Sequence, residues 1–400
     1  MKNVRAIFSA AVLCCAMSPC ALAQNGLKQL AVLKPSNAGG NDFFGSWVSE
    51  SGNVITTNCF GGECIFVKPP KGWRNMRQTA TLTASDGTVL FAPFISGNTI
   101  AATAEDGAVH VFVEPPTGWA DMTETAKLTT ADANTMQVVA INGNTIIGGS
   151  EGAIVGFNQP GAAYVFVEPA GGWTDMTQTA ELTSSDGKTG DTFGYSVAIS
   201  GGTIVVGARN ANVGSGTAQG AAYVFVEPAD GWATATETGK LTASDGSDDA
   251  GLGWSASING NTIVVGAPLQ DDANGSFGGS AYVFVEAQEG WGSMTETARL
   301  SPANGIDYGD VGWSVAVNGN LILAGSPGLP GLCQRQAVYE FLKPVSGWQS
   351  ATQNAALSPQ KAPAYAEFGY GVSLSGGTVV VSAPGSGSTN NQGLAYVFGP

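Results

Sequence analysis

The hydrophobic pattern of this chain is a phrase of four apolar runs that recurs along the sequence. In one copy the runs begin at Tyr195 (YSVAI), Thr203 (TIVVGA), Ala222 (AYVFVEP) and Glu237 (ETGKLTA). Short runs rich in Val, Ile, Thr and aromatic residues, bounded by Gly, Asn and Ser, predict β-strands. The chain is therefore predicted to repeat a four-stranded unit. The Trp of a Gly-Trp pair marks the period, at Trp73, Trp119, Trp173, Trp232, Trp291 and Trp348.

The first two strands of each unit are joined by a tight turn, as in Ser200-Gly201-Gly202 and Asn259-Gly260-Asn261. Asn-Gly between apolar runs is a strong hairpin signal, because the turn needs positive φ angles. The second and third strands are apolar at consecutive positions, so both faces of the sheet must be buried. Radially packed blades bury both faces of an antiparallel sheet, and the pattern therefore predicts an all-β propeller of four-stranded antiparallel blades.

Seven copies of the first hairpin predict seven blades. They lie near Trp47, Phe94, Val139, Val197, Ala256, Val315 and Val372. The last copy ends at its third strand, AYVF before Pro400, and LKQLAVL from Leu27 resembles the missing fourth strand. We therefore expect the N-terminal strand to complete the last blade and close the ring, which also removes exposed sheet edges.

Residues 1–23 have the form of a secretory signal peptide. Lys2 and Arg5 precede an apolar run, and Ala21-Leu22-Ala23 fits a cleavage site. The remaining 24–400 are expected to form a single propeller domain that is secreted, periplasmic or held at the cell surface. No segment is long and apolar enough to predict a membrane span.

Three cysteines remain after such cleavage. Cys59 and Cys64 flank Phe60-Gly61-Gly62-Glu63 between two strand-like runs, which favours a disulfide across the hairpin over two unpaired thiols. Cys333 is left over and is expected to be a free thiol in a loop.

The composition limits the class of partner. The chain has 57 glycines, only 12% charged residues and a net charge of −15. The negative charge argues against nucleic acid and anionic membranes as partners. It favours solubility and a cationic protein or glycan partner, and we expect a monomer.

Three phrases resemble FG-GAP repeats: FGYSV from Phe193, VVGAP from Val264 and VVSAP from Val380. The resemblance covers nearly all of 24–400 and is clearest in the units that start at Phe193, Leu252, Val311 and Phe368. It implies the seven-bladed propeller of integrin α heads and related secreted bacterial proteins, and an adhesion or protein-binding role.

Many FG-GAP propellers also carry an Asp-rich calcium loop between the first two strands. Here that connection is only ISGGT or INGNT, so the resemblance does not extend to calcium at the usual site, and no cofactor is expected. Other acidic clusters are interpreted as solvated loop carboxylates rather than ligands, because none has calcium-loop spacing. They are Asp245/Asp248/Asp249, Asp271/Asp272 and Asp307/Asp310.

The loops between second and third strands vary between units, whereas the first turns are uniform. We call the end of the propeller that carries them the variable face; its loops are Arg209–Gly220, Leu269–Gly279, Gly328–Gln336 and Gly385–Gly393. Variation on one face of a regular scaffold is typical of a binding surface, although unselected drift explains it equally well.

Aromatic residues recur where the first strands begin. In integrin-like heads, aromatics at this place surround the channel mouth and can hold a cationic side chain, and cation–π attraction would supply the contact. The resemblance thus implies a binding site; the alternative is ordinary packing between blades. The six candidates are Phe193, Tyr195, Trp254, Trp313, Phe368 and Tyr370.

Catalysis is not predicted. The single histidine, His110, replaces the tyrosine of a third strand, so no nucleophile–base pair that relies on histidine can be assembled elsewhere. No phosphate-binding loop and no zinc-ligand spacing is present. The alternative is a glycan-active hydrolase or lyase that uses only carboxylates, with Asp248, Asp249 and Asp272 as candidates.

Overall fold

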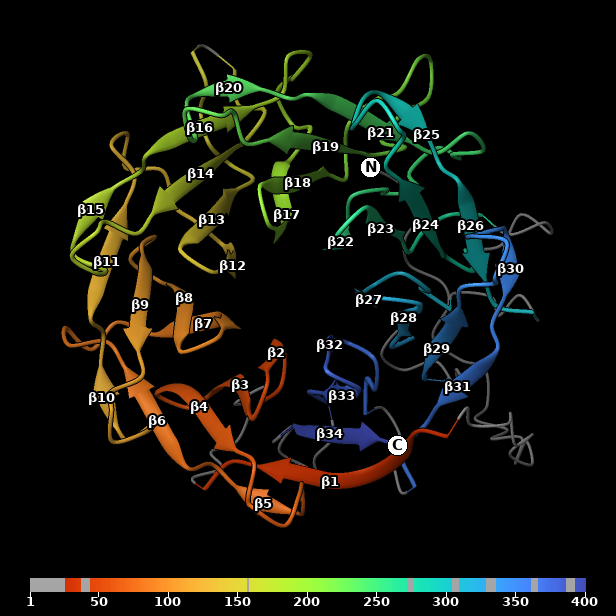
Figure 1. The fold of residues 1–400 in the computed structure, drawn as a ribbon. Helices are drawn as coiled ribbons and strands as arrows, with labels where there is room; N and C mark the ends of the chain where they lie inside the picture. Colours follow the sequence, from red (N-terminus) through yellow and green to blue (C-terminus); the bar gives the residue numbers. More distant parts are fainter. Residues whose placement is uncertain are drawn as a thin grey trace, which may run out of the picture.

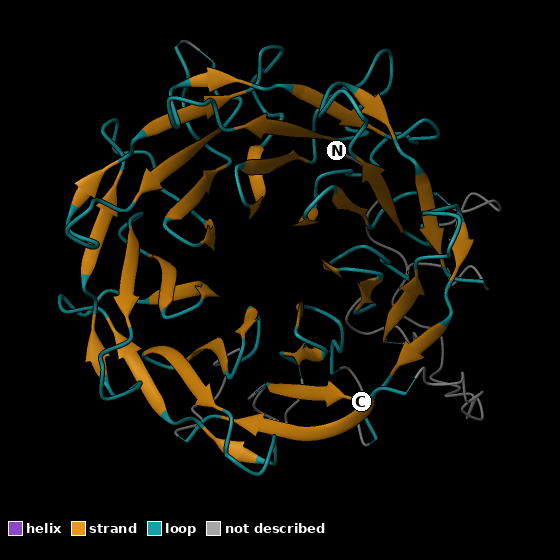
Figure 2. Cartoon of the chain, in the orientation of Figure 1, coloured by secondary structure: helices purple, strands orange, loops and turns teal. Residues whose placement is uncertain are grey.

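The computed structural model describes residues 26–36, 44–156, 158–271, 277–303, 309–328, 336–360, 366–385 and 393–400. Seven β-sheets are arranged in a ring (Figure 1), and the innermost strands of all seven line a central cavity, the channel. The described residues contain strands, turns and loops and no helix (Figure 2). The predicted all-β fold with seven blades is confirmed. The predicted signal peptide, 1–23, and Cys333 lie outside the described residues.

Each blade has four main antiparallel strands that follow one another outward from the channel. The innermost strands are β2 (Val48–Ser51), β7 (Leu90–Ser96), β12 (Val138–Asn142), β17 (Phe193–Ser200), β22 (Ser255–Asn259), β27 (Val315–Asn318) and β32 (Val372–Ser375). The second strands are β3 (Val54–Cys59), β8 (Thr99–Ala104), β13 (Thr145–Ser150), β18 (Thr203–Ala208), β23 (Thr262–Ala267), β28 (Leu321–Ser326) and β33 (Thr378–Ala383).

The third strands are β4 (Gly62–Val67), β9 (Val109–Val113), β14 (Ala162–Val167), β19 (Ala221–Val226), β24 (Ser280–Val285), β29 (Ala337–Leu342) and β34 (Leu394–Gly399). The fourth strands are β6 (Ala80–Thr83), β11 (Ala126–Thr129), β16 (Ala180–Thr183), β21 (Gly239–Thr242), β26 (Ala298–Ser301), β31 (Ala355–Leu357) and β1 (Lys28–Lys34).

Six blades also carry a fifth strand of two residues that the sequence pattern did not predict. The next unit along the chain contributes it, and it runs parallel to the fourth strand, so each one ties two neighbouring blades together at the outer rim. These short strands are β5 (Met76–Arg77), β10 (Met122–Thr123), β15 (Met176–Thr177), β20 (Ala235–Thr236), β25 (Met294–Thr295) and β30 (Ala351–Thr352).

The last sheet joins the two ends of the described chain. Strand β1 pairs antiparallel with β34, from Lys28 opposite Gly399 to Leu33 opposite Ala395. In Figure 1 the red β1 lies directly along the blue β34. Leu33 is fully buried. Strand β1 therefore occupies the position of the fourth strand in the blade formed by β32, β33 and β34.

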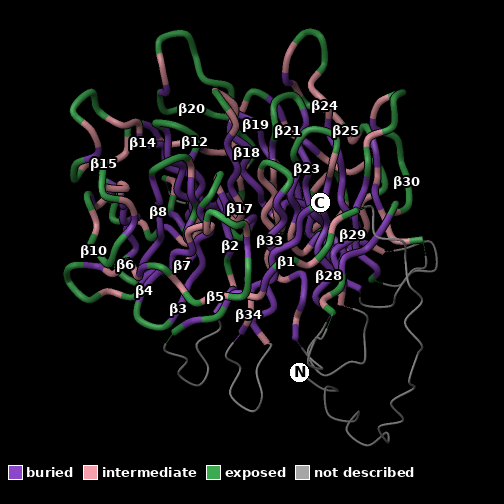
Figure 3. The backbone as a smooth tube through the Cα atoms, turned by 60° about the horizontal axis from the view of Figure 1, so that its bottom comes forward, coloured by how far each residue is buried: buried purple, intermediate pink, exposed green. Residues whose placement is uncertain are grey.

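The hydrophobic core lies between the blades. One cluster combines Ile147 and Val165 of the third blade with Phe193, Val206 and Tyr223 of the fourth. Figure 3 shows the buried segments concentrated in the strands and the exposed ones in the loops at both ends. Both faces of each blade are thus covered by its neighbours, as the doubly apolar strands predict.

Hydrogen bonds between neighbouring blades supplement this packing; we call the arrangement, an Asp after one blade bound to two side chains of the next, the polar clamp. Asp186, which follows the third blade, accepts hydrogen bonds from the Tyr223 hydroxyl at 2.9 Å and the Lys240 ammonium at 2.6 Å, both in the fourth blade. Burial raises the pKa of Asp186, but the two hydrogen bonds together with the positive charge of Lys240 and a backbone hydrogen bond hold the pKa below its usual value. Asp245, one of the predicted solvated acids, clamps Tyr282 and Arg299 of the next blade in the same way.

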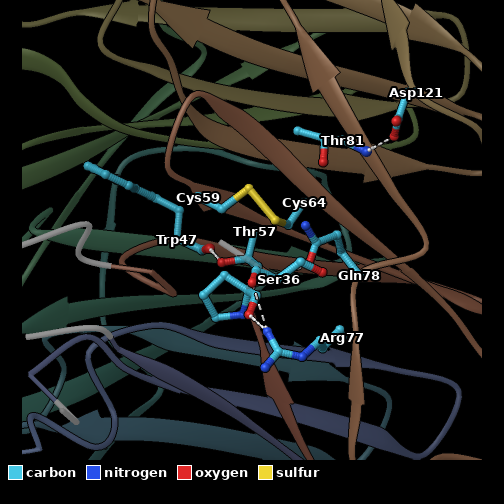
Figure 4. The surroundings of a disulfide bond; sticks show 10 residues. Ser36, Trp47, Thr57, Cys59, Cys64, Arg77, Gln78, Thr81 and Asp121 are labelled. Carbon is cyan, nitrogen blue, oxygen red and sulfur yellow. Dashed lines mark hydrogen bonds between the residues drawn. A yellow bond between two sulfur atoms is a disulfide. The ribbon is translucent and has the colours of Figure 1, made fainter. Parts of the chain in front are cut away.

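The first blade contains the disulfide expected from the sequence. Cys59 and Cys64 are bonded across the turn between β3 and β4, with 5.7 Å between their Cα atoms (Figure 4). The bond closes a loop of only a few residues, so its entropic contribution to stability is modest.

Candidate functional site

The central channel is lined by an arc of four aromatic side chains from four consecutive blades. Ring centroids are 5.4 Å apart between Tyr195 and Trp254, 4.8 Å between Trp254 and Trp313, and 5.4 Å between Trp313 and Tyr370. All four side chains are half-buried. We call these four residues the aromatic arc. Because each ring contacts the next, they form one continuous apolar surface.

The other two predicted site residues lie elsewhere. Phe193 and Phe368 are fully buried, and each packs edge-on against two aromatic rings of its own blade, such as Tyr223 and Phe225 around Phe193. The glycine that follows has a φ of +93° at Gly194, and the pairing of β17 shifts register there. This irregularity breaks the alternation of side chains along the strand, so Phe193 is buried in the blade while Tyr195 lines the channel. The expectation that all six aromatics surround the channel is therefore wrong for Phe193 and Phe368.

The arc lines a cavity of about 370 Å³ in the channel, to which the inner parts of all seven blades contribute. Across from the arc, Trp47 and Phe94 of the first two blades are 41% and 40% exposed. Sequence reasoning missed both, because neither stands at the place of Tyr195 in its unit: Trp47 comes one residue later and Phe94 three residues later. The cavity therefore has aromatic side chains on two sides.

A cation of the chain itself already occupies part of the arc. The Arg209 guanidinium carbon lies 3.9 Å from the ring centroid of Tyr195 and 4.6 Å from that of Trp254. Cation–π contacts of this kind are worth about 0.5–2 kcal/mol. The family resemblance implied a partner's cation at this place, but Arg209 lies over the first two rings. Trp313 and Tyr370 are the part of the arc at which no arginine or lysine stacks among the described residues.

Arg209 also relates the arc to the variable face, because it follows β18 and begins the loop Arg209–Gly220. That loop is hydrogen-bonded to Asp248 and Asp249, two of the acidic candidates. The Thr217 amide donates to the Asp248 carboxylate at 2.8 Å, and the Asp249 amide donates to the Thr217 carbonyl at 2.9 Å. The Asp248 carboxylate therefore has a structural role, whereas Asp249 contributes its backbone amide.

The structure describes some of the other acidic candidates and variable loops but not all of them. Asp310 is buried, and burial raises its pKa to about 6. Asp271 uses its backbone carbonyl to accept a hydrogen bond from Arg299. Asp272 and Asp307 lie outside the described residues. The same is true of part of the variable-face loop Leu269–Gly279 and of most of the loops Gly328–Gln336 and Gly385–Gly393.

His110 is a core residue. Its ring is fully buried, with Nε2 at 3.3 Å from an Asp106 carboxylate oxygen and Nδ1 at 3.8 Å from Glu124. It occupies the third-strand position that Tyr223 holds in the fourth blade, and Asp106 also contacts Lys127. Lys127 also contacts Asp86, which follows the first blade as Asp186 follows the third, so this contact resembles the polar clamp between other blades.

Glu50 carries a pH-dependent prediction. It lies in β2, almost fully buried, near Thr378 and the backbone of Ser375 in the last blade. Burial raises its pKa to about 8, although Thr378, Lys68 and Ser375 oppose this. Since the folded state binds this proton more tightly than the unfolded state, stability falls as pH rises from about 4.5 to about 8.

Glu50→Gln removes this titration, so the variant should gain stability over the wild type on the order of 2–4 kcal/mol between pH 5 and pH 9. Urea unfolding at several pH values measures the difference. Glu289→Gln, at an exposed position, serves as the control and should leave the pH profile unchanged. A constant difference between Glu50→Gln and wild type at all pH values would contradict the prediction.

Comparison with known proteins agrees with this architecture. The profile of the FG-GAP repeat family matches residues 176–225, 235–284 and 351–398. A search of curated proteins found no significant match. Among solved structures, a crystal structure of the computationally designed Ika8 protein aligns over 93% of this chain and 100% of its own, with 12% identity and a TM-score of 0.48. That likeness is too weak to support any conclusion.

The fold and the channel define a seven-bladed β-propeller. More particularly, three stretches of this propeller match the FG-GAP repeat family. Each matched stretch begins in or next to a two-residue rim strand and ends in a third strand, so one repeat spans the junction of two blades. Among the described residues, no helix is long and apolar enough to span a membrane.

Proposed function

We propose that this protein is a secreted, non-catalytic binding or adhesion module that recognises a protein or glycan partner through the variable face. The observation that carries the proposal is the aromatic arc, four contiguous half-buried rings that line a cavity. Burial of large aromatic side chains on binding supplies much of the free energy at protein interfaces. Such rings also stack on sugars, which have apolar faces.

The arc also suggests what the partner presents. Arg209 covers Tyr195 and Trp254, so a ligand group has Trp313 and Tyr370 available. With a net charge of −15 on the chain, a cationic or neutral group is favoured over an anionic one at this position. The ligand would then place a basic side chain or a sugar ring over these two residues.

A library selection tests the proposal. A phage-displayed peptide library and a glycan array are screened against the immobilised chain from residue 24 onward. Affinities of the selected ligands are then measured for Trp313→Ala, Tyr370→Ala and the control Val226→Ala. Val226 is 43% exposed and ends β19, at the opposite end of the propeller from the variable face.

Trp313→Ala and Tyr370→Ala should each weaken binding by about tenfold or more, and Val226→Ala should leave it unchanged. Circular dichroism establishes that the variants remain folded. Equal affinity in all three variants would refute the role of the aromatic arc. Release of reducing sugar ends from a bound glycan would instead support the carboxylate-based enzyme.

A further inference from the structure

A second cavity lies at the outer rim of the last blade, away from the channel. It has a volume of about 480 Å³ and lies between β1, β5 and β34. Its polar lining includes Lys34, Arg77, Gln29, Asn75 and Gln360. A volume of this size is in the range of small-molecule sites. Two cations therefore share one cavity on a chain whose net charge is −15.

The repeats show that these cations are exceptional. Lys34 of β1 and Arg77 of β5 are partners in the parallel rim pairing of the last blade. At the other five rim pairings, the corresponding partners are small hydroxyl residues. They are Thr83 with Thr123, Thr129 with Thr177, Thr183 with Thr236, Thr242 with Thr295, and Ser301 with Thr352. The fold therefore does not require charge at this position.

Lys34 and Arg77 are both exposed, and like charges on adjacent strands repel each other weakly there. Within the described part of the chain, neither Lys34 nor Arg77 forms an ion pair. The Arg77 guanidinium is instead fixed by the backbone carbonyls of Pro35 at 2.7 Å and Ser36 at 2.9 Å (Figure 4). A bound anion would offset the repulsion and complete the charge balance of the cavity.

The amide side chains add donors to the same cavity. The Gln29 side-chain oxygen accepts from the Gln360 backbone amide at 3.0 Å, and the Asn75 side-chain oxygen accepts from the Val32 amide at 2.8 Å. With their oxygens engaged, Gln29 and Asn75 have their NH₂ groups left to donate. The rest of the lining is apolar or aromatic, namely Val32, Met76, Leu394 and Tyr396.

We propose that this cavity, the rim pocket, binds the oxyanion of a small polar ligand, a carboxylate or sulfate group such as an acidic sugar carries. Lys34 and Arg77 would bind the anionic group, and the amides of Gln29 and Asn75 would donate to hydroxyls of the ligand. The apolar lining would contact the face of the sugar ring. The rim pocket is separate from the aromatic arc, and this proposal does not depend on the function proposed for the variable face.

Isothermal titration with galacturonate, sodium sulfate and galactose tests the proposal, with ionic strength matched by sodium chloride. The wild-type chain from residue 24 is compared with Lys34→Thr/Arg77→Thr, which installs the pair found at the other rim junctions. Lys34→Thr alone keeps the two carbonyl contacts of Arg77 and so preserves the local fold. Lys71→Thr, at another exposed lysine, is the matched control.

The wild type and Lys71→Thr should bind galacturonate saturably, and galactose should not bind at the same concentrations. Lys34→Thr should weaken binding, and the double variant should weaken it by about tenfold or more. Binding of sulfate without galacturonate would assign the site to sulfate groups. Absence of saturable binding of either anion, or equal affinity in the double variant, would overturn the proposal.

Discussion

Removal of residues 24–35 is expected to destabilise the propeller by about 5 kcal/mol or more, since burial of one leucine alone is worth roughly 2–5 kcal/mol. The deletion removes β1, which includes the buried Ala31 and Leu33. It also exposes the edge of β34, which pairs with β1 along its length. An exposed, apolar edge strand favours aggregation as well. Thermal and urea unfolding of the truncated chain measure the loss.

Addition of a synthetic peptide of residues 24–35 provides the control. The peptide should pair with β34 and restore much of the lost stability, whereas a scrambled peptide of the same composition should not. A truncated chain that unfolds at the same urea concentration as the chain from residue 24 would show that β1 contributes little. The ring would then depend on the other six blades alone.

Gly220→Ala is expected to cost about 3 kcal/mol or more, because the substitution would separate two blades. Gly220 precedes β19 and forms a parallel bridge to Leu252, where the next blade begins. A methyl group at Gly220 would lie 2.1 Å from the Leu252 carbonyl oxygen and 2.4 Å from its nitrogen. The φ of +80° is itself unfavourable for alanine.

Gly260→Ala separates these two effects. Gly260 has a φ of +57° in an exposed turn, and a methyl group there would meet no atom within 4 Å. Its cost should therefore be only about 1–2 kcal/mol, the strain of the left-handed conformation. Urea unfolding of both variants measures the difference, and equal costs would mean that the contact between Gly220 and Leu252 does not limit blade spacing.

The number of blades could be predicted because each unit repeats strong local signals. Asn259-Gly260 forces a hairpin, and consecutive apolar residues such as Ile204 and Val205 require burial on both sides of the sheet. These features depend only on residues within one unit. The rim strands escaped prediction because a pair such as Met294-Thr295 is too short to show any periodicity.

The candidate site was predictable only in part. The sequence placed Tyr195, Trp254, Trp313 and Tyr370 together because they share one position in the repeat. It could not separate them from Phe193, since the register shift after Phe193 depends on pairing with β18. Arg209 stands in a variable loop, and only the three-dimensional arrangement brings it over the rings of Tyr195 and Trp254.

Asp245 illustrates the same limit for charged residues. In the sequence it belongs to an acidic loop cluster, which favours a solvated carboxylate. In the structure it accepts hydrogen bonds from Tyr282 and Arg299 of the following blade. The partners lie in another unit, so no local pattern indicates the contact.

The most direct test of the account is a crosslink between the two ends of the folded chain. Lys28→Cys and Gly399→Cys, which replace opposite residues of β1 and β34, are combined in a Cys333→Ser background. Opposed residues on paired strands are within reach of a disulfide. Mild oxidation followed by mass spectrometry should show near-complete formation of the disulfide between residues 28 and 399 in the monomer. Free thiols at both positions after oxidation of the folded protein would contradict a blade shared by the two ends of the chain.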